Sequence, residues 1–161
     1  MSGELIVDLK KLDLSRVLYG KEAIREVCPQ RGRLEMLDGI LHYDEGQGVI
    51  VGFKDIHADD WWVPDHIPGR PIFPGVLMIE CCAQLCSFDF IKRNPHIDHT
   101  KFFIGYGGLD KVRFRAAVPP GRRFIMVGKV RRIRSRTFTY LAQGFVGETL
   151  AFETQIVGVA M

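Results

Sequence analysis

The longest apolar segment of the chain runs from Gly75 to about Lys92, and its pattern predicts a helix. No glycine or proline lies between Val76 and Lys92, and most of these residues are good helix formers. Pro74 stands where the first turn of a helix tolerates proline. Apolar residues occupy nearly every face, which is typical of a helix enclosed by the rest of the protein.

The second half of the chain has a different period. In "KVRFRAAV" (residues 111–118), basic residues at odd positions alternate with Val112, Phe114 and Ala116, a period of two that indicates a half-buried strand. Three further segments, 123–133, 137–146 and 149–160, have the pattern of successive antiparallel strands joined by short turns. This half is therefore expected to form a sheet.

Upstream of the helix, residues 33–43 and 48–56 are rich in β-forming residues and flank "DEGQG", so they predict a hairpin. Residues 57–74 are expected to be a loop. A short amphipathic helix, interrupted near Gly20 and ended by Pro29, is predicted by Leu14, Val17, Leu18, Ile24 and Val27. One long helix with about six strands predicts an α+β fold, in which a curved antiparallel sheet wraps around the helix.

Length and composition exclude only a few classes of function. A chain of 161 residues suits one domain, and 47% hydrophobic with 25% charged residues is ordinary for a globular protein. The N-terminus is a poor secretory signal, and Glu80, Gln84 and Asp89 interrupt the apolar segment, so no membrane span is expected. The four cysteines lack metal-ligand spacing, which favours reduced core residues in a cytoplasmic protein and no metal site.

Charge is distributed unevenly, although the net charge is +3. Residues 111–136 contain ten Lys or Arg and no acid, whereas twelve of the nineteen acids lie in residues 1–60. A basic segment of this kind can meet nucleic acid or an acidic protein, or it can be the solvated face of strands. Nucleic acid ranks last, because no binding fingerprint and no spaced aromatic platforms accompany the charge.

Glu80 is the anomaly of the apolar segment. A carboxylate on an enclosed helix pays a desolvation cost unless it is paired, hydrogen-bonded or neutralised. Gln84 lies one turn further on, close enough for its amide to donate to that carboxylate. The pair is either a polar stripe with a chemical task or, alternatively, a structural hydrogen bond on a face that meets solvent.

His66 lies in a Pro/Gly-rich loop that leads to Gly75 at the predicted start of the helix. The first amides of a helix lack intrahelical acceptors, and the helix dipole favours negative charge there. An imidazole, a carboxyl group and a free amide are the base, acid and oxyanion stabiliser required for proton abstraction next to a carbonyl. Taken alone, His66 could also be a packing residue.

These residues carry a resemblance. "HIPGRPIFPGVLMIECCAQ", from His66 to Gln84, resembles the segment H-F-P-G-x-P-x-x-P-G-V-L-x-x-E-x-x-x-Q of the β-hydroxyacyl-acyl-carrier-protein dehydratases, which have the hotdog fold. "GGLDKVRFRAAVPPGRRF" and "AIREVCPQRGRLEMLDGIL" resemble flanking parts of the family. The resemblance covers roughly residues 23–161 as a hotdog dehydratase domain and leaves residues 1–22 as an N-terminal extension.

The resemblance implies a hydro-lyase of fatty-acid or specialised lipid biosynthesis that needs no cofactor. His66 would remove the α-proton, Glu80 would protonate the leaving hydroxyl or orient the water formed, and the Gly75 amide would polarise the thioester carbonyl. A homodimer would bring His66 and Glu80 together, with a hexamer of three dimers as a further option. The substrate-binding residues would be Trp62, Pro74, Val76, Gln84 and Tyr106. The partner would be acyl carrier protein, an acidic protein that could be met by Arg113, Arg115, Arg122, Arg123, Arg131 and Arg132.

Several positions depart from the family pattern and leave alternatives open. Ile67 replaces the usual Phe, "DWWVPD" replaces a Phe pair, and "GYGG" replaces an aromatic pair, leaving Tyr106 as a gate or a core residue. Acyl-chain length is therefore not determined. The alternatives are a hydratase or thioesterase acting on coenzyme A thioesters and a catalytically silent acyl-binding or scaffold subunit.

Overall fold

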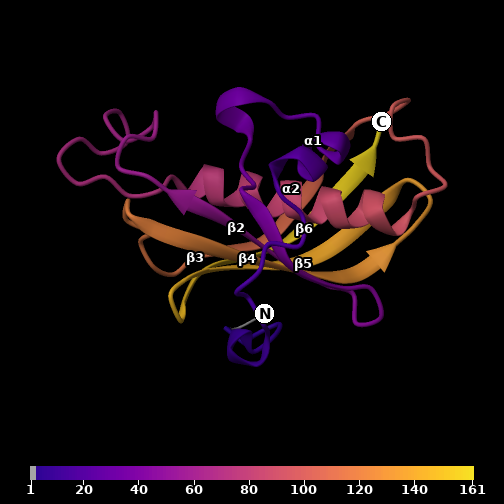
Figure 1. Cartoon of the computed structure of the whole chain (residues 1–161), viewed down its shortest axis with the longest axis horizontal. Coiled ribbons are helices and arrows are strands. Elements are labelled where there is room, and N and C mark those ends of the chain that lie inside the picture. The colour runs from indigo at the N-terminus through magenta and orange to yellow at the C-terminus, as the bar shows by residue number, and fades with distance from the viewer. Residues whose placement is uncertain (1–2) are drawn as a thin grey trace.

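The computed structural model describes residues 3–161, and its main elements are one long helix and six strands (Figure 1). The elements are α1 (Lys21–Val27), β1 (Gly39–Asp44), β2 (Val49–Ile56), α2 (Gly75–Arg93), β3 (Ile104–Phe114), β4 (Arg122–Ile133), β5 (Thr137–Val146) and β6 (Thr149–Ala160). Short 3-10 turns occur at Leu9–Lys11 and Gly32–Leu34. The predicted α+β class is confirmed.

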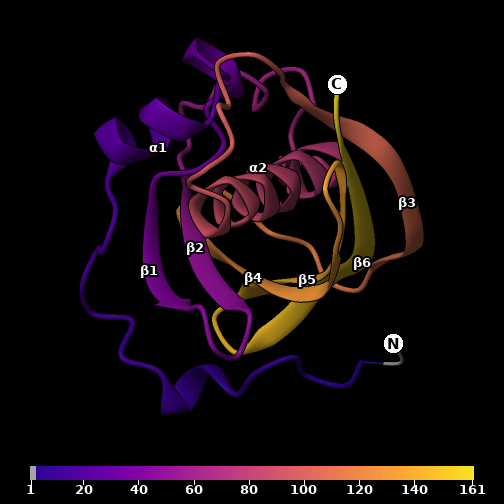
Figure 2. The same cartoon turned by 90° about the vertical axis from the view of Figure 1, so that its right-hand side faces the viewer.

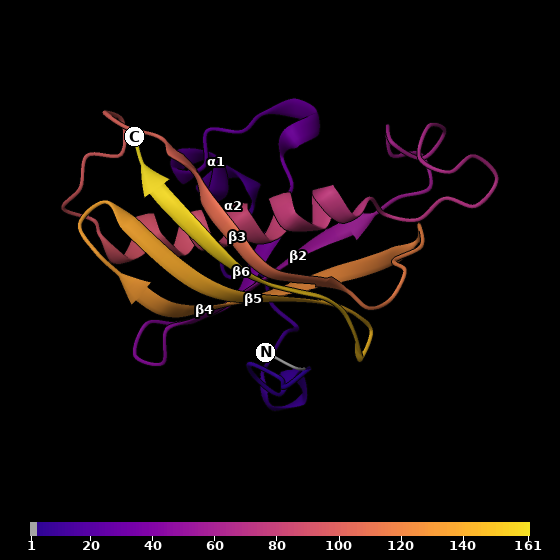
Figure 3. The ribbon, with the colours of Figure 1, turned by 180° about the vertical axis from the view of Figure 1, so that it is seen from behind.

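The strands form one antiparallel sheet in the order β1-β2-β4-β5-β6-β3, so that β1 and β3 are its edges. Seen close to the helix axis, the sheet curls around α2, with β1 on one side and β3 on the other (Figure 2). The view from behind shows the same layers, with α2 crossing the concave face (Figure 3). A curved sheet wrapped around one helix is what the sequence pattern predicted, and it is the hotdog arrangement that the resemblance implied.

The bounds of α2 follow from local sequence. Pro74 has φ −59° and its carbonyl accepts from the amides of Leu77 and Met78, at 2.9 and 3.1 Å, which starts the helix. The helix ends at Arg93 because Asn94 precedes Pro95, and a residue before proline is disfavoured in the helical conformation. None of the helices within residues 3–161 has the length and apolarity needed to cross a bilayer.

The core lies between α2 and the concave face of the sheet. Its helical part includes Leu77, Met78, Leu85, Phe88 and the cysteines of "CCAQLC", all of them buried. All four cysteines of the chain are buried and unbridged, as predicted. Burial raises the pKa of the Cys81, Cys82 and Cys86 thiols well above the ordinary value, so these groups behave as small apolar side chains.

The last two strands run over the predicted residues, whereas the strand expected at residues 111–118 differs. Strand β3 begins earlier, at Ile104, and ends at Phe114. A bulge between Asp110 and Arg113 inserts one residue, and Lys111 takes a φ of +54°. The bulge interrupts the simple alternation. Phe114 packs on the buried Phe152 of β6, on the face that was expected, but it is 54% exposed because β3 is an edge strand.

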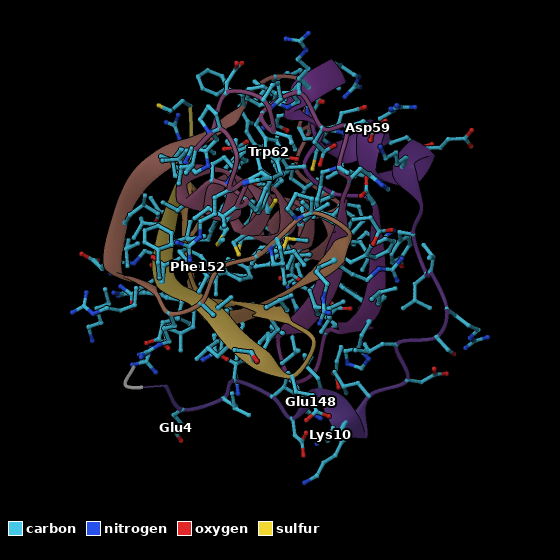
Figure 4. All side chains as sticks on the ribbon, turned by 90° about the vertical axis from the view of Figure 1, so that its left-hand side faces the viewer. Glu4, Lys10, Asp59, Trp62, Glu148 and Phe152 are labelled. Carbon is cyan, nitrogen blue, oxygen red and sulfur yellow. The ribbon has the colours of Figure 1, made fainter. Side chains whose placement is uncertain are left out.

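The helix predicted from Leu14 is wrong in its first half. Residues 21–27 are helical, but Leu14 belongs to an extended strap, and Tyr19 pairs with Ile40 in an isolated bridge. The strap, residues 3–14, crosses the outer face of the sheet opposite α2 (Figures 2 and 4). Its apolar side chains pack on a second cluster that contains Val49, Val51, Val127 and Phe145.

The strap is also held by hydrogen bonds. Gln143 of β5 is fully buried, accepts from the Ile6 amide at 2.9 Å and donates to the Glu4 carbonyl at 2.7 Å. Lys10 forms an exposed ion pair with Glu148 at 3.0 Å, visible below the sheet in Figure 4. The chain's own N-terminal segment therefore covers part of the outer face of the sheet.

Candidate active site

His66 lies in the loop between β2 and α2, which projects beyond the end of the sheet (Figures 1 and 3). Its Nδ1 atom is 2.8 Å from the carbonyl oxygen of Ile72. Because a carbonyl only accepts hydrogen bonds, Nδ1 carries the proton of the neutral ring and Nε2 keeps a free lone pair. This is the tautomer in which a histidine can act as a base through Nε2.

The loop around His66 is rigidly anchored. The His66 amide donates to the Trp62 carbonyl at 2.8 Å, and the Trp62 indole contacts the imidazole edge-on. Trp62 is 3% exposed and packs on Phe73. The Phe73 amide in turn donates to the Val118 carbonyl at 2.8 Å. Trp62, predicted as a substrate-binding residue, therefore supports the imidazole from the core side.

The residue after His66 is strained. Ile67 has a φ of +58°, in the left-handed region that a β-branched residue rarely adopts, and its side chain is 47% exposed. Conformations of this kind cost about 1–3 kcal/mol and persist where the surrounding structure imposes them. The Pro/Gly-rich loop thus holds the backbone next to His66 in one unusual conformation.

Gly75 is the first residue of α2. The two amides that follow Val76 both bond the Pro74 carbonyl, so the amides of Gly75 and Val76 have no acceptor within the helix. An ideal Cβ at Gly75 would lie 2.6 Å from the Phe114 ring, so a larger residue here would displace this side chain. Val76 is 70% exposed, whereas Pro74 is buried.

Glu80 lies one and a half turns into α2 and is half-buried. Gln84 donates from Nε2 to Glu80 Oε1 at 2.7 Å, as the spacing predicted, and the Tyr106 hydroxyl donates to Oε2 at 2.9 Å. Gln84 is 2% exposed; it also donates to the Leu34 carbonyl at 2.7 Å and accepts from the Met36 amide at 3.0 Å. The carboxylate is therefore fixed by one donor on each oxygen.

Glu80 opens into a pocket between α2 and the strands β3, β5 and β6. The lining residues are Gln30, Glu80, Ala83, Gln84, Ser87, Ile104, Gly105, Tyr106, Phe138, Ile156, Val157 and Gly158. Among the residues that the structure describes, none of those lining this pocket comes from the loop 57–74. One copy of the chain thus brings together Glu80, Gln84 and Tyr106, but it leaves His66 outside their pocket.

Comparison with known proteins identifies the family of the chain. The family model of the FabA-like domain matches residues 28–155, which is most of the chain. The chain belongs to the FabA-like family. The 3-hydroxyacyl-acyl-carrier-protein dehydratase FabZ of Desulforamulus reducens is 34% identical over 84% of this chain and 92% of that protein. FabZ of Moorella thermoacetica is 30% identical over the same shares.

Solved structures with the same fold have diverged further from this FabA-like chain. The dehydratase heterocomplex ApeI:P of Xenorhabdus doucetiae superposes with a TM-score of 0.71 at 13% identity, covering 86% of this chain and 90% of the other. Cj0977 of Campylobacter jejuni superposes with a TM-score of 0.62 at 13% identity, covering 87% and 88%. These likenesses confirm the hotdog fold, and the FabZ relatives confirm the predicted family and its hydro-lyase class.

The six predicted partner-binding arginines of this FabA-like protein do not form one patch. Arg122 and Arg131 are nine residues apart on β4, which is about 30 Å along a strand, and Arg113 lies three strands away on β3. Arg115 pairs with the buried Glu153, and Arg123 pairs with Asp55 at 2.7 Å. Within residues 3–161, carboxylate partners are absent for Arg113, Arg122, Arg131 and Arg132.

Sequence reasoning missed several pocket residues. Ser87 is on the same helical face as Glu80 and Gln84, so its spacing of seven from Glu80 was a usable signal. Gln30 and Phe138 carry no such signal, because only the folding of distant segments brings them to the pocket. Among the described residues no cluster of three His, Cys, Asp or Glu side chains is arranged to hold a metal.

Proposed function

We propose that this chain dehydrates a β-hydroxyacyl thioester carried by acyl carrier protein to the trans-2-enoyl thioester. The observation that carries the proposal is the separate preparation of two side chains, His66 as a base and Glu80 as an acid. His66 donates a hydrogen bond from Nδ1 to the Ile72 carbonyl, which leaves Nε2 free to act as a base. Glu80 accepts hydrogen bonds from two donors in its pocket. Both residues stand in the segment that aligns with the dehydratase motif.

In the proposed reaction, His66 Nε2 takes the proton from the α-carbon of the acyl chain. The electrons of that C–H bond form the α,β double bond as the β-carbon–oxygen bond breaks. The leaving hydroxyl takes a proton from Glu80 and departs as water. The imidazolium then returns its proton to the carboxylate, so the enzyme is unchanged and one water is released for each enoyl thioester.

The amide of Gly75 stabilises the transition state in this proposal. Negative charge develops on the thioester oxygen as the α-proton leaves, and an N–H group at a helix N-terminus is a preset donor for it. The Phe114 ring lies against Gly75 on the side where other residues carry a Cβ. Pro74 and Val76 flank it and would contact the thioester end of the substrate.

We propose a homodimer as the active unit, because one copy leaves His66 outside the Glu80 pocket. Edge strand β3 has one side without a neighbouring strand in the described chain, and it carries exposed Tyr106, Leu109 and Phe114, while Val76 is 70% exposed nearby on α2. An edge strand with exposed apolar side chains is a template for pairing with a second chain. A partner seated there would supply the second half of each site, and three such dimers could assemble further.

Domain division, location and carrier recognition complete the proposal. The dehydratase domain comprises residues 23–161, with residues 1–22 as an extension whose strap packs on it. The buried free cysteines support a cytoplasmic location, where thiols stay reduced.

The arginines without carboxylate partners support steering of an acidic carrier protein. Reversing the charge of Arg113 and Arg131 by substitution with Glu should raise KM for carrier-bound substrate at low salt.

The shared site is tested by mixing two inactive variants. His66→Ala and Glu80→Ala should each lower kcat by about 100- to 10,000-fold on a β-hydroxyacyl carrier-protein thioester, followed by enoyl absorbance. Unfolding and reassembling them together should restore about a quarter of the parent activity, because half of the dimers are mixed and each of these has one intact site.

Absence of restored activity from mixed dimers would overturn the shared site. The coenzyme A thioester of the same acyl group is assayed in parallel, with release of free thiol measured as well. Turnover of that substrate alone, or thiol release in place of the enoyl product, would favour the hydratase or thioesterase alternative. No product with either substrate would favour the scaffold alternative.

A further inference from the structure

The Glu80 carboxylate has two donors that come from different elements. Gln84 is on the same helix, one turn away, whereas Tyr106 reaches Glu80 from edge strand β3. The bonds are 2.7 Å to Oε1 and 2.9 Å to Oε2. Two donors on different oxygens fix both the position and the plane of a carboxylate, which a single donor does not.

The local backbone explains why Tyr106 can reach the helix. A bulge between Tyr106 and Gly108 leaves Gly107 as the extra residue, and bulges redirect neighbouring side chains. Tyr106 faces Gly158 across the β3–β6 pair, which leaves room for the phenol. A Cβ at Gly107 would lie 2.5 Å from a methyl group of Val159, so a larger residue in this bulge would displace that side chain.

The hydroxyl of Tyr106 is a constant donor. Burial raises the pKa of the phenol well above its usual value of 10, and the negative charge of Glu80 raises it further. The ring is 48% exposed, but the hydroxyl end lies in the Glu80 pocket. The phenol therefore keeps its proton throughout the pH range in which an enzyme of this kind is assayed.

We infer that Tyr106 is a positioning residue, which orients the Glu80 carboxylate for the leaving hydroxyl rather than forming the wall of the acyl pocket. This inference rests on the proposed role of Glu80. Each oxygen of the Glu80 side chain accepts one bond from the protein, so in the acid form the proton lies on the remaining position of one oxygen, from which it can pass to the leaving hydroxyl. Loss of the Tyr106 bond leaves the carboxylate free to rotate about the Gln84 contact, which lowers the rate of the chemical step.

A positioning role for Tyr106 predicts that its hydrogen bond affects kcat and leaves KM nearly unchanged. Tyr106→Phe keeps the ring and removes the oxygen, so we expect kcat to fall by about 10- to 100-fold, the range of a hydrogen bond to a charged group, with KM within about twofold. Tyr106→Ala also removes the ring, and it should lower kcat similarly while raising KM. Tyr43→Phe is the matched control; it makes the same change away from the pocket and should keep kcat.

Thermal unfolding of each variant checks that the fold is retained. A kcat of Tyr106→Phe within about twofold of the parent, whatever happens to KM, would overturn the inference and make Tyr106 a wall residue. Glu80→Gln is assayed beside it. Full activity of Glu80→Gln would overturn the proposed function itself, whereas a loss in Glu80→Gln with none in Tyr106→Phe would overturn only the role of Tyr106.

Discussion

Changing Gln84 to Glu tests the hydrogen-bond network behind the site with the smallest change of shape. The parent side chain is 2% exposed, and its Nε2 atom donates two bonds of 2.7 Å, to Leu34 and Glu80. The introduced carboxylate can still accept from Met36, but it places an acceptor against the carbonyl and against the carboxylate. Gln84→Glu therefore replaces two attractive contacts with two repulsive ones.

The magnitude follows from these contacts. Each lost bond removes about 0.5–1.5 kcal/mol, and each buried acceptor left without a donor adds about 1–3 kcal/mol, less where water can enter beside Leu34. We expect the free energy of unfolding to fall by about 3–5 kcal/mol at pH 7. That is a large share of the roughly 5–15 kcal/mol available to a domain of this size.

The loss should shrink as the pH falls. Burial next to Glu80 should raise the folded-state pKa of the introduced carboxyl above its ordinary value near 4.3. At pH values between the unfolded and the folded pKa, the native variant therefore binds more protons than the unfolded chain. The stability of the variant relative to the parent therefore rises as the pH drops through the folded pKa. Once protonated, the introduced group can donate one bond again.

Urea unfolding at pH 7 and pH 5 measures both effects. Gln84→Met controls for loss of the bonds without added charge, and Gln155→Glu makes the same charge change on a less buried residue of β6. The reasoning is wrong if Gln84→Glu unfolds at pH 7 within about 1 kcal/mol of the parent, or if its deficit is equal at both pH values.

Two further predictions concern other parts of the fold. Gln143→Met removes both bonds to the strap, so stability should fall by about 1–3 kcal/mol and trypsin should cut faster after Lys10 and Lys11; unchanged cleavage, with Gln155→Met as control, would contradict this. Burial raises the pKa of Tyr43 to about 12, so the native state keeps a proton that the unfolded chain loses near pH 10. Stability should therefore fall between pH 10 and 12 in urea unfolding, and an equal fall in Tyr43→Phe would assign the effect to other groups.

Much of the fold could be predicted because its signals are local. Strands β5 and β6 occupy the expected residues because short turn segments bound them, and Gly147, with φ +58°, makes the turn between them. The helix α2 could be placed from Pro74 and the absence of helix breakers as far as Arg93. In each case the decisive residues lie within a few positions of the element they define.

The errors occurred where distant contacts compete with local preference. Leu14 has helical spacing with its neighbours, but its side chain packs with the strap against the outer face of the sheet. Phe114 faces the helix side, as its alternating pattern predicts, and lies against Phe152 and Gly75, yet its position on edge strand β3 leaves it 54% exposed. Neither contact is visible from spacing along the chain.

The candidate site divides in the same way. The sequence by itself determined the pairing of Glu80 with Gln84, because residues four apart on a helix are neighbours in space. It also determined that His66 leads to a helix N-terminus. Only the tertiary structure decided that Tyr106 completes the carboxylate's hydrogen bonds and that His66 lies outside its pocket, because the curvature of the sheet, set by all six strands together, brings β3 over the helix and leaves the loop beyond it.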